Sequence, residues 1–183
     1  MNSFPYALWL IPSGELLGRL GATVADLAVR FNAHPFGPHL TLCSGEWPAG
    51  LPALKTAMAG FCRGLAPVSL GVEGFGHTDD FFTFFFIRLI DNNSQRLFEQ
   101  ATSAINGSRP AKVGPHISLL YSDHGADIDQ AVAIDRARLA KEISPGIPRK
   151  INFDCVQLVM PASGNWRDIS RWEVSSSIML DRI

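Results

Sequence analysis

One hexapeptide occurs twice in this chain, and the second copy begins 77 positions after the first. The copies read Gly-Pro-His-Leu-Thr-Leu over 37–42 and Gly-Pro-His-Ile-Ser-Leu over 114–119. In a strand, the histidine and the hydroxyl residue of each copy share one face, and the two apolar residues share the other. Each copy therefore predicts a buried strand that presents one imidazole and one hydroxyl. Side by side, two such strands form a pocket, the candidate active site, whose members are His39, Thr41, His116 and Ser118.

The likeness between the two parts of the chain extends beyond the hexapeptide. A shift of 77 also places the apolar run 6–11 on the run 83–88, and one predicted helix on another. Each half predicts the order strand, helix, histidine strand, helix, strand, and one more strand follows. We therefore expect a duplicated α+β fold, a single bilobal domain over 1–183 with pseudo-repeats at about 4–76 and 81–160 and a closing strand at about 169–180.

Hydrophobic periodicity and turn residues give the expected elements. Apart from the two histidine strands, strands are expected at 6–11, 68–72, 81–90, 151–160 and 171–180. Helices are expected after the caps Ser13, Asn92 or Asn93, and Asp127, and also over 51–61. Gly107 is the expected stop of the helix that follows the asparagines.

Composition limits the kind of ligand. The net charge is −1 and the sequence pI is about 6.5, so the chain lacks the charge needed to grip long nucleic acid, although a pocket can hold a small anion. The apolar run 6–12 is too short to span a membrane and has no basic segment before it, so neither an anchor nor a secretory signal is expected. Cys43, Cys62 and Cys155 lack the spacing of metal ligands, which favours reduced thiols in a cytoplasmic protein. We expect a monomer.

Two histidines near neutral pH can divide acid–base work, one accepting a proton while the other donates one. Hydrolysis of a phosphodiester needs both, a base for the attacking water and an acid for the leaving oxygen. Thr41 and Ser118 would bind the non-bridging phosphate oxygens and hold phosphorus between the imidazoles. Because a protonated histidine and two hydroxyls offset part of the phosphate charge, no metal or other cofactor is required.

Other interpretations of the repeated motif are open. Each histidine could be a hydrogen-bonded core residue, although matched hydroxyls at equal spacing disfavour this. A zinc site could use Cys43, which by simple alternation shares the face of His39 and Thr41. The second strand, however, has Leu120 at that position, and no further ligand lies at a fitting spacing. Serine hydrolase chemistry is disfavoured because the chain has no nucleophile-elbow motif.

The two His-x-Thr/Ser motifs in a duplicated chain resemble those of the 2H phosphoesterase superfamily. More narrowly, the chain is similar to plant- and yeast-type 2′,3′-cyclic nucleotide phosphodiesterases in the segments 6–12, 36–41, 115–121 and 172–180. The resemblance implies two antiparallel sheets around a central cleft with helices outside, and metal-independent opening of a cyclic phosphate. Substrates in such families include nucleoside 2′,3′-cyclic phosphates and ADP-ribose 1″,2″-cyclic phosphate.

The resemblance also implies roles for individual residues. His39 and His116 are the expected catalytic pair, and Thr41 and Ser118 are the expected phosphate binders. Tyr121 matches a tyrosine near the site of the family. Simple alternation places this tyrosine on the face opposite the second histidine, so a bend at the strand end would be needed.

A nucleoside needs a surface on which its base can stack, and aromatic faces supply about 1–3 kcal/mol per stacked base. The candidates are Trp166 in the loop 161–168, Trp9, and one face of Phe82, Phe84 and Phe86. Arg167, beside the loop tryptophan, could meet a second phosphate or simply be solvated.

The expected activity is hydrolysis of small cyclic phosphodiesters of nucleotides to phosphomonoesters, with a small nucleotide as the partner. An alternative of the same class is processing of 2′-5′ or cyclic-phosphate RNA ends, which the near-neutral pI disfavours. An alternative of another class is a nucleotide-binding module without catalysis, which the presence of all four motif residues disfavours.

Overall fold

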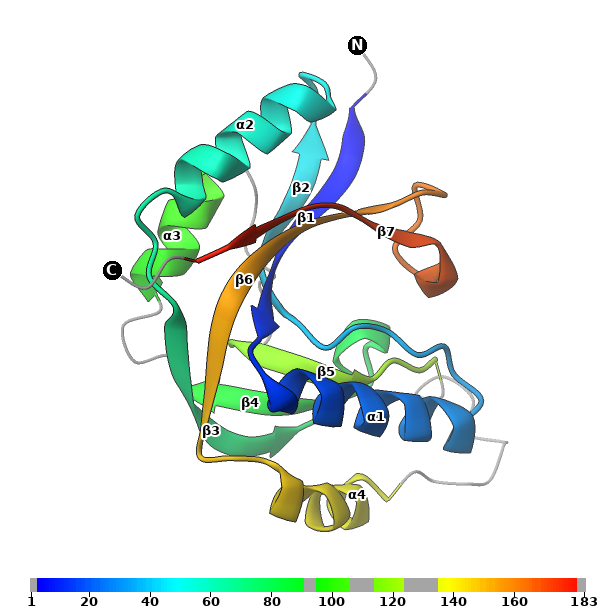
Figure 1. Cartoon of the computed structure of the whole chain (residues 1–183). Helices are drawn as coiled ribbons and strands as arrows, with labels where there is room; N and C mark the ends of the chain where they lie inside the picture. The colour runs from blue at the N-terminus through cyan, green and yellow to red at the C-terminus, as the bar shows by residue number, and fades with distance from the viewer. Residues whose placement is uncertain (1–2, 91–94, 106–113, 124–134, 181–183) are drawn as a thin grey trace.

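The computed structural model describes residues 3–90, 95–105, 114–123 and 135–180 (Figure 1). The strands and α-helices are, in chain order, β1 (Phe4–Pro12), α1 (Glu15–Arg30), β2 (Leu40–Trp47), α2 (Leu51–Cys62), β3 (Val68–Gly76), β4 (Phe85–Ile90), α3 (Gln95–Ala104), β5 (His116–Leu120), α4 (Arg136–Ile143), β6 (Lys150–Pro161) and β7 (Trp172–Met179). Short 3-10 turns lie at Phe81–Thr83, Ser144–Gly146 and Ile169–Arg171. Each half follows the element order expected from the sequence, and β7 is added at the end.

The helix starts follow local capping chemistry, and some differ from the prediction. Ser13 does not cap α1, because the helix begins after Gly14, whose φ of 62° is a left-handed conformation that glycine adopts readily. Helix α4 begins at Arg136, where the Asp135 side chain accepts a hydrogen bond from the backbone amide of Arg138. The predicted caps and stop that lie outside the described residues are Asn92, Asn93, Gly107 and Asp127.

The single strand predicted over 81–90 is divided in the structure. Its first residues form a 3-10 turn over Phe81–Thr83, and β4 begins only at Phe85. The turn is closed by the amide and the hydroxyl of Thr78, which donate to the carbonyl of Thr83 at 2.9 and 3.1 Å. As a result, residues 82 and 83 leave the strand and reach the candidate site.

The seven strands of the described chain form one antiparallel sheet in which β6 is shared. One edge of β6 pairs with β1 over 153–159, and the other edge pairs first with β3 over 150–153 and then with β7 over 155–161. The sheet therefore branches at β6 into the arms β2-β1-β6-β7 and β6-β3-β4-β5 (Figure 1). The two sheets expected from the resemblance are thus two arms of one sheet, because the 12 residues of β6 are enough to serve both.

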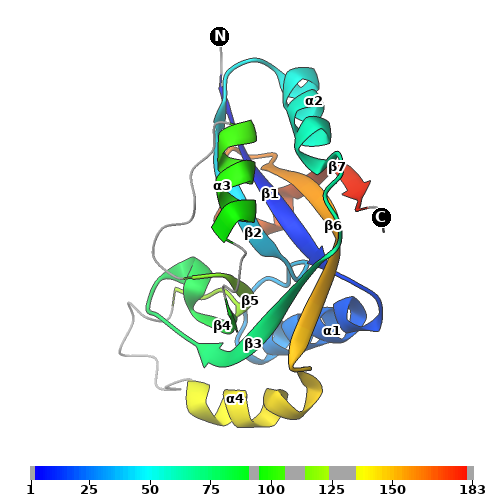
Figure 2. The same ribbon diagram turned by 90° about the vertical axis from the view of Figure 1, so that its left-hand side faces the viewer.

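Each half of the chain covers the histidine strand of the other half with a helix. Helix α1 packs against β5, and α3 packs against β2, so the covering helices are exchanged between the halves (Figure 2). The hydroxyl of Tyr6 in β1 donates to the carbonyl of Ile105 at 2.7 Å, which further ties the first half to the end of α3. Among the helices of the described ranges, none is long and apolar enough to cross a membrane.

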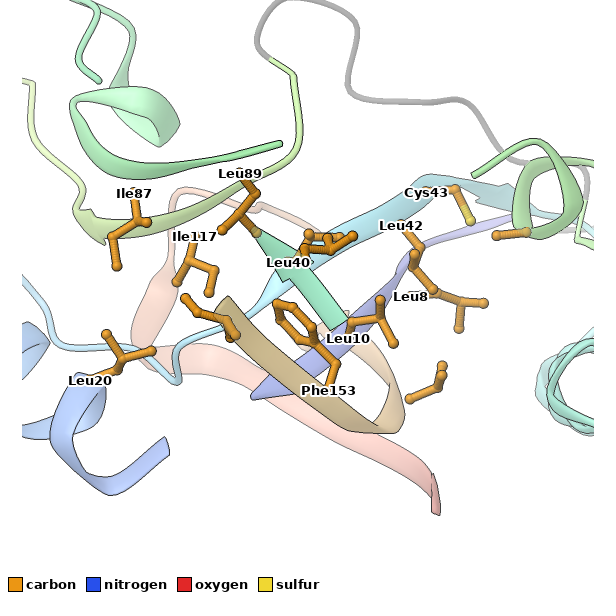
Figure 3. Close-up of a cluster of buried hydrophobic side chains, with 14 of the residues drawn as sticks. Leu8, Leu10, Leu20, Leu40, Leu42, Cys43, Ile87, Leu89, Ile117 and Phe153 are labelled. Atoms are coloured by element: carbon orange, nitrogen blue, oxygen red, sulfur yellow. The ribbon is translucent and has the colours of Figure 1, made fainter. Parts of the chain in front are cut away.

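The two arms and their helices enclose one main hydrophobic core (Figure 3). Buried side chains from β1 to β6 and from α1 to α4 meet there, among them Leu8, Leu10, Leu20, Leu40, Leu42, Ile87, Leu89, Ile117 and Phe153. The apolar positions of each hexapeptide thus point into this core. A smaller apolar cluster on the opposite face of the first arm contains Ala7, Trp9, Ile11, Cys155 and Val159. The histidine face of the sheet is therefore the face away from the main core.

Phe153 lies at the branch of the sheet, where it is fully buried and pairs with Pro12 of β1 and with Val68 of β3. We predict that Phe153→Ala lowers the free energy of unfolding by about 3–5 kcal/mol, because truncation of a buried aromatic ring leaves a cavity. Urea unfolding followed by tryptophan fluorescence and by circular dichroism measures this. Both signals should keep one common transition, and separate transitions for the two probes would contradict a shared core. The control is Val29→Ala at a site that is 84% exposed, where we expect a change below about 0.5 kcal/mol.

Candidate active site

One cavity of about 230 Å³ is lined by residues from both arms of the sheet. Seven residues proposed from the sequence lie in its wall, namely His39, Thr41, His116, Tyr121, Trp166, Trp9 and Phe82. The other described residues of the wall are Ala7, Ser44, Thr83 and Trp172. The two copies of the hexapeptide therefore contribute to a single site.

The two histidine rings are held in the same way. Nδ1 of His39 donates to the carbonyl of Gly37 at 2.6 Å, and Nδ1 of His116 donates to the carbonyl of Gly114 at 2.9 Å. A carbonyl oxygen can only accept, so the proton of each neutral ring is on Nδ1, and Nε2 carries the lone pair. Each ring can therefore accept a proton at Nε2, or donate one from it once protonated.

A β-bulge interrupts the side-chain alternation of β2. The register with β1 slips after Thr41, which leaves Leu42 unpaired in the described ladder. Past the bulge the faces are exchanged, so Cys43 is buried in the main core and Ser44 lines the cavity. The prediction that Cys43 shares the face of His39 is therefore wrong.

The same irregularity occurs at the equivalent position of β5. The register with β4 slips after Ser118, which leaves Leu119 unpaired in that ladder. Leu120 consequently turns into the main core, and Tyr121 lines the cavity together with His116. This bulge is the bend that Tyr121 needs in order to reach the site.

The two hydroxyl residues of the motif differ in their surroundings. Thr41 is half-buried in the cavity wall, and its hydroxyl has no hydrogen-bond partner among the described residues. Ser118 is buried and is not among the described lining residues, and its Oγ donates to the carbonyl of Phe82 at 2.8 Å. The structure therefore brings Thr41 to the cavity and places Ser118 behind its wall, because the 3-10 turn presents a carbonyl to the serine.

Aromatic rings enclose His39. Trp9 stacks on it with the ring centroids 3.6 Å apart and the planes inclined by 9°. Phe36 and Trp172 approach the same imidazole edge-on, each with its centroid at 6.2 Å. Tyr121 stacks in turn on Phe36 at 3.9 Å. The histidine is consequently only 5% exposed.

The outer wall of the cavity comes from the loop between β6 and β7. Trp166 lines the cavity, and its carbonyl accepts a hydrogen bond from Nε1 of Trp172 at 2.9 Å. Arg167 forms an ion pair with Asp123 at 2.5 Å and lies over the ring of Phe81 at 4.8 Å. This arginine is therefore engaged at the rim of the cavity, and the loop is fastened to the end of the opposite arm.

Only some of the aromatic residues proposed to contact a nucleoside line the cavity. Trp9 and Phe82 line the cavity along with the loop tryptophan, whereas Phe84 is buried in the main core and Phe86 packs against His116. Lining residues that sequence reasoning missed are Ala7, Ser44, Thr83 and Trp172. A usable signal existed for one of them, since Ser44 occupies the repeat position of the suspected tyrosine at 121.

Burial lowers the pKa of both histidines. The pKa of His39 falls to about 4, chiefly because the ring is buried, while the bond to the Gly37 carbonyl opposes the fall and the charge of His116 adds to it. Burial also lowers the pKa of His116, against the opposing bond to the Gly114 carbonyl. Because His39 is the more deeply buried ring, a proton is less costly to place on His116. Because the two sites interact, their titration steps belong to the pair.

Other ionisable groups contribute little near neutral pH. The described lining residues include no lysine, arginine, aspartate or glutamate. Burial raises the pKa of the Tyr121 phenol well above its usual range, and it raises the pKa of the Cys43 thiol to about 12. Within the described ranges, no three histidine, cysteine or acidic residues come together as metal ligands. The cavity is therefore an apolar, aromatic space with two imidazoles as its titrating groups.

The fold is that of known 2H phosphoesterases. The structure of E. coli LigT with NADP+ matches with a TM-score of 0.60 at 16% identity, covering 98% of this chain and 99% of that one. LigT with 3′-AMP matches with a TM-score of 0.60 at 13% identity and coverages of 99% and 100%. Kluyveromyces marxianus Usb1 matches with a TM-score of 0.50 at 14% identity and coverages of 96% and 97%. The resemblance seen in the sequence motifs is thus confirmed for the fold. No protein-family model matches the sequence, and neither does any curated protein.

We predict that acid destabilises the protein through His39. Because its pKa is lower in the folded than in the unfolded protein, unfolding takes up a proton, and stability falls as the pH drops from about 6.5 to about 4. The expected loss is on the order of 3 kcal/mol, since each unit of pKa difference corresponds to about 1.4 kcal/mol. Urea unfolding at about pH 7.5 and about pH 4.5 measures it. His39→Asn does not titrate and should lose much less over that range. Equal pH dependence in both proteins would contradict the assignment.

Proposed function

We propose that this protein hydrolyses small cyclic phosphodiesters of nucleotides to phosphomonoesters without a metal ion. Nucleoside 2′,3′-cyclic phosphates and ADP-ribose 1″,2″-cyclic phosphate are the substrates to test. The observation that carries the proposal is the pair of histidines in one cavity, His39 and His116, each with Nδ1 bonded to a carbonyl and a lone pair on Nε2. The 2H phosphoesterase-like fold supports it.

The reaction needs one proton on the histidine pair. The neutral ring takes a proton from water, the water oxygen bonds to phosphorus, and the bond from phosphorus to one ribose oxygen breaks. The protonated ring gives its proton to that ribose oxygen, so the product has a free hydroxyl and a phosphomonoester. The number of protons on the pair is unchanged by the turnover. Because burial lowers the pKa of both rings, the free protein holds this single proton only at acidic pH, and a bound phosphodiester anion would raise the affinity of the pair for it.

The charge of the cavity suits a phosphodiester. One imidazolium can balance the single negative charge of a cyclic phosphodiester, and the described lining has no lysine or arginine to balance more. A phosphomonoester carries a charge of about −1.5 to −2 near neutral pH, so it is held less well in this apolar space. The product should therefore bind more weakly than the substrate, which limits inhibition by product.

Polar side chains are available for the phosphate oxygens. Thr41 is the hydroxyl best placed to donate to a non-bridging oxygen, since it lines the cavity and no other described residue engages its hydroxyl. Tyr121 stays a neutral phenol because of its raised pKa, and its hydroxyl, which is hydrogen-bonded with Ser118, can turn to donate a second hydrogen bond to the phosphate. Ser118 can contribute only if its hydroxyl leaves the carbonyl of Phe82.

The aromatic wall offers faces for the nucleoside. Trp166, Trp172 and Phe82 line the cavity, and one stacked base is worth about 1–3 kcal/mol. The E. coli LigT structures contain ATP, NADP+ or 3′-AMP, all of which are nucleotides. The last of these is a phosphomonoester of the kind that opening of a 2′,3′-cyclic phosphate yields, which supports the proposed product.

Replacing either histidine should abolish most of the activity. We predict that His39→Ala and His116→Ala each reduce kcat on nucleoside 2′,3′-cyclic phosphates by at least about 10², because each removes one proton transfer. The double variant should be little worse than the poorer single one, since the two residues act as a unit. Phosphorus NMR of the products, with excess EDTA present, measures both the rate and the position of the phosphate. The control is His34→Ala in an exposed loop, which should keep normal turnover.

Each alternative function has its own result in this assay. Tight binding of nucleotides without turnover by the wild-type protein would favour the binding module. A much higher kcat/KM on cyclic-phosphate RNA ends than on mononucleotides would favour RNA end processing. Loss of activity in EDTA that zinc or magnesium restores would contradict a metal-independent mechanism. Near-normal turnover by His39→Ala would show that the pair is not catalytic.

The two hydroxyls of the motif should be unequal in catalysis. We predict that Thr41→Ala lowers kcat/KM by roughly 10- to 100-fold, because it removes a hydrogen bond to a charged group worth about 1.5–3 kcal/mol. Ser118→Ala should cost less in kcat/KM and more in stability, because it removes the hydrogen bond that this buried serine donates to the carbonyl of Phe82. Steady-state kinetics and urea unfolding of both variants measure this. Equal kinetic losses would show instead that the serine turns to the phosphate on binding.

A further inference from the structure

The aromatic neighbours of the two histidines occupy equivalent positions of the repeat. Trp9 of β1 pairs with Thr41, and Phe86 of β4, 77 residues later, pairs with Ser118. Directly paired residues of antiparallel strands have side chains on one face. Each ring therefore lies on the face that carries the histidine of its own half. The equivalent ring is an indole in the first half and a phenyl in the second.

The contacts that these two rings make are unequal. Trp9 and His39 form a near-parallel stack, with centroids 3.6 Å apart and an angle of 9°. Phe86 and His116 are tilted by 59°, with centroids 5.0 Å apart. A parallel stack covers a whole face of the imidazole and excludes water from it, whereas a tilted ring covers less. In agreement, His39 is 5% exposed, whereas His116 is only half-buried.

Charged neighbours are not the main cause of the lowered pKa of His39, which is burial. The titratable groups that share the cavity with it are His116 and Tyr121, and the phenol stays neutral. Phe36 and Trp172, which also pack against it, do not titrate. The carbonyl bond at Nδ1 is present in both halves and so cannot distinguish the rings. Among the described neighbours, the aromatic cover is what differs.

Charged neighbours do not account for the lowered pKa of His116 either. Arg88 of β4 pairs with it across the sheet, and Arg88 is itself ion-paired with Glu73 of β3 at 3.6 Å. A nearby cation disfavours protonation of a histidine. The ion pair with Glu73 offsets this effect, and the pKa of His116 is lowered by burial and not by the arginine.

We propose that Trp9 is a positioning residue that makes two histidines of a symmetric motif unequal. Its stack shields His39 from water and keeps that ring unprotonated, while the tilted Phe86 leaves His116 open to hold the shared proton. The kinetic consequence rests on the proposed function, but the titration of the two rings is a property of the free protein.

Phe86 is in turn placed by Gly76 of β3, its partner in the β3–β4 ladder. A Cβ added at this glycine would lie 2.5 Å from two atoms of the phenylalanine ring, so the ring occupies space that a side chain would need. Gly76 is not among the described residues of the cavity wall. Gly76→Ala must therefore displace the ring and disturb His116 from outside the site.

The test is an NMR titration of both imidazoles in the free wild-type protein and in Trp9→Phe and Trp9→Leu. We expect Trp9→Leu to raise the pKa of His39 by at least about one unit and that of His116 by much less, because water gains access to the first ring. Trp9→Phe retains a ring and should give a smaller shift. The acid limb of the kcat/KM profile should move to higher pH in the same order.

Variants of the second half provide the matched comparison. Phe86→Leu and Gly76→Ala should change the pKa of His116 and leave the pKa of His39 unchanged. Gly71→Ala is the control on the same strand, because its Cβ would meet a side-chain methyl of Ile90 at 3.1 Å and not the phenylalanine ring. This control should change the pKa of neither histidine. Trp9→Phe keeps an aromatic ring next to His39, so it answers the question even if a leucine variant fails to fold.

An unchanged His39 titration in both Trp9 variants would overturn the proposal, and so would equal shifts of the two rings. These results can be read apart from the enzymatic assay. A wild-type protein that turns over no cyclic phosphate contradicts the proposed function and leaves the titration result to decide the role of Trp9. An active enzyme whose titration does not respond to Trp9 contradicts only the positioning role.

Discussion

The hydrogen bond from Nδ1 of each histidine to the carbonyl two residues earlier is the contact on which the site depends. Donor and acceptor, His39 with Gly37 and His116 with Gly114, belong to the same hexapeptide, so the bond is specified locally in each copy. It satisfies one nitrogen of a buried ring and decides which nitrogen does chemistry. The branched sheet and the exchanged helices then bring two such local units to one cavity. Without that bond, a buried imidazole would have neither a fixed tautomer nor a fixed direction.

What could be predicted from the sequence is what depends on near neighbours. The order of elements, the burial of Leu40 and Ile117, and the pairing of two histidines all follow from short-range patterns. The bulges do not, because a bulge is a property of two strands in register, and the sequence of one strand does not reveal it. Simple alternation therefore places Cys43 on the wrong face, and it brings Tyr121 to the site only if the strand bends. The single branched sheet was missed for the same reason, since only the pairing partners of β6 reveal it.

The repeat predicts two equal halves, and the structure departs from that equality around the two histidines. Thr41 faces the cavity, whereas Ser118 is engaged by a backbone carbonyl. An indole covers one histidine, and a phenyl leans against the other. An acid and a base must differ in protonation at the same pH, and identical surroundings would give both rings the same affinity for a proton. Substitution of the neighbours can supply this difference while the motif itself stays unchanged.

The exchange of helices between the halves bears on how such a chain could have arisen. A half-length chain with one hexapeptide would leave the core side of its histidine strand bare, because the helix that covers it belongs to the other half. Two such chains related by a twofold axis would cover one another, each lending its helix, and would share one cavity with identical imidazoles. Joining them into one polypeptide frees the two copies to mutate independently. Only then could tryptophan and phenylalanine come to occupy the same place beside the two histidines.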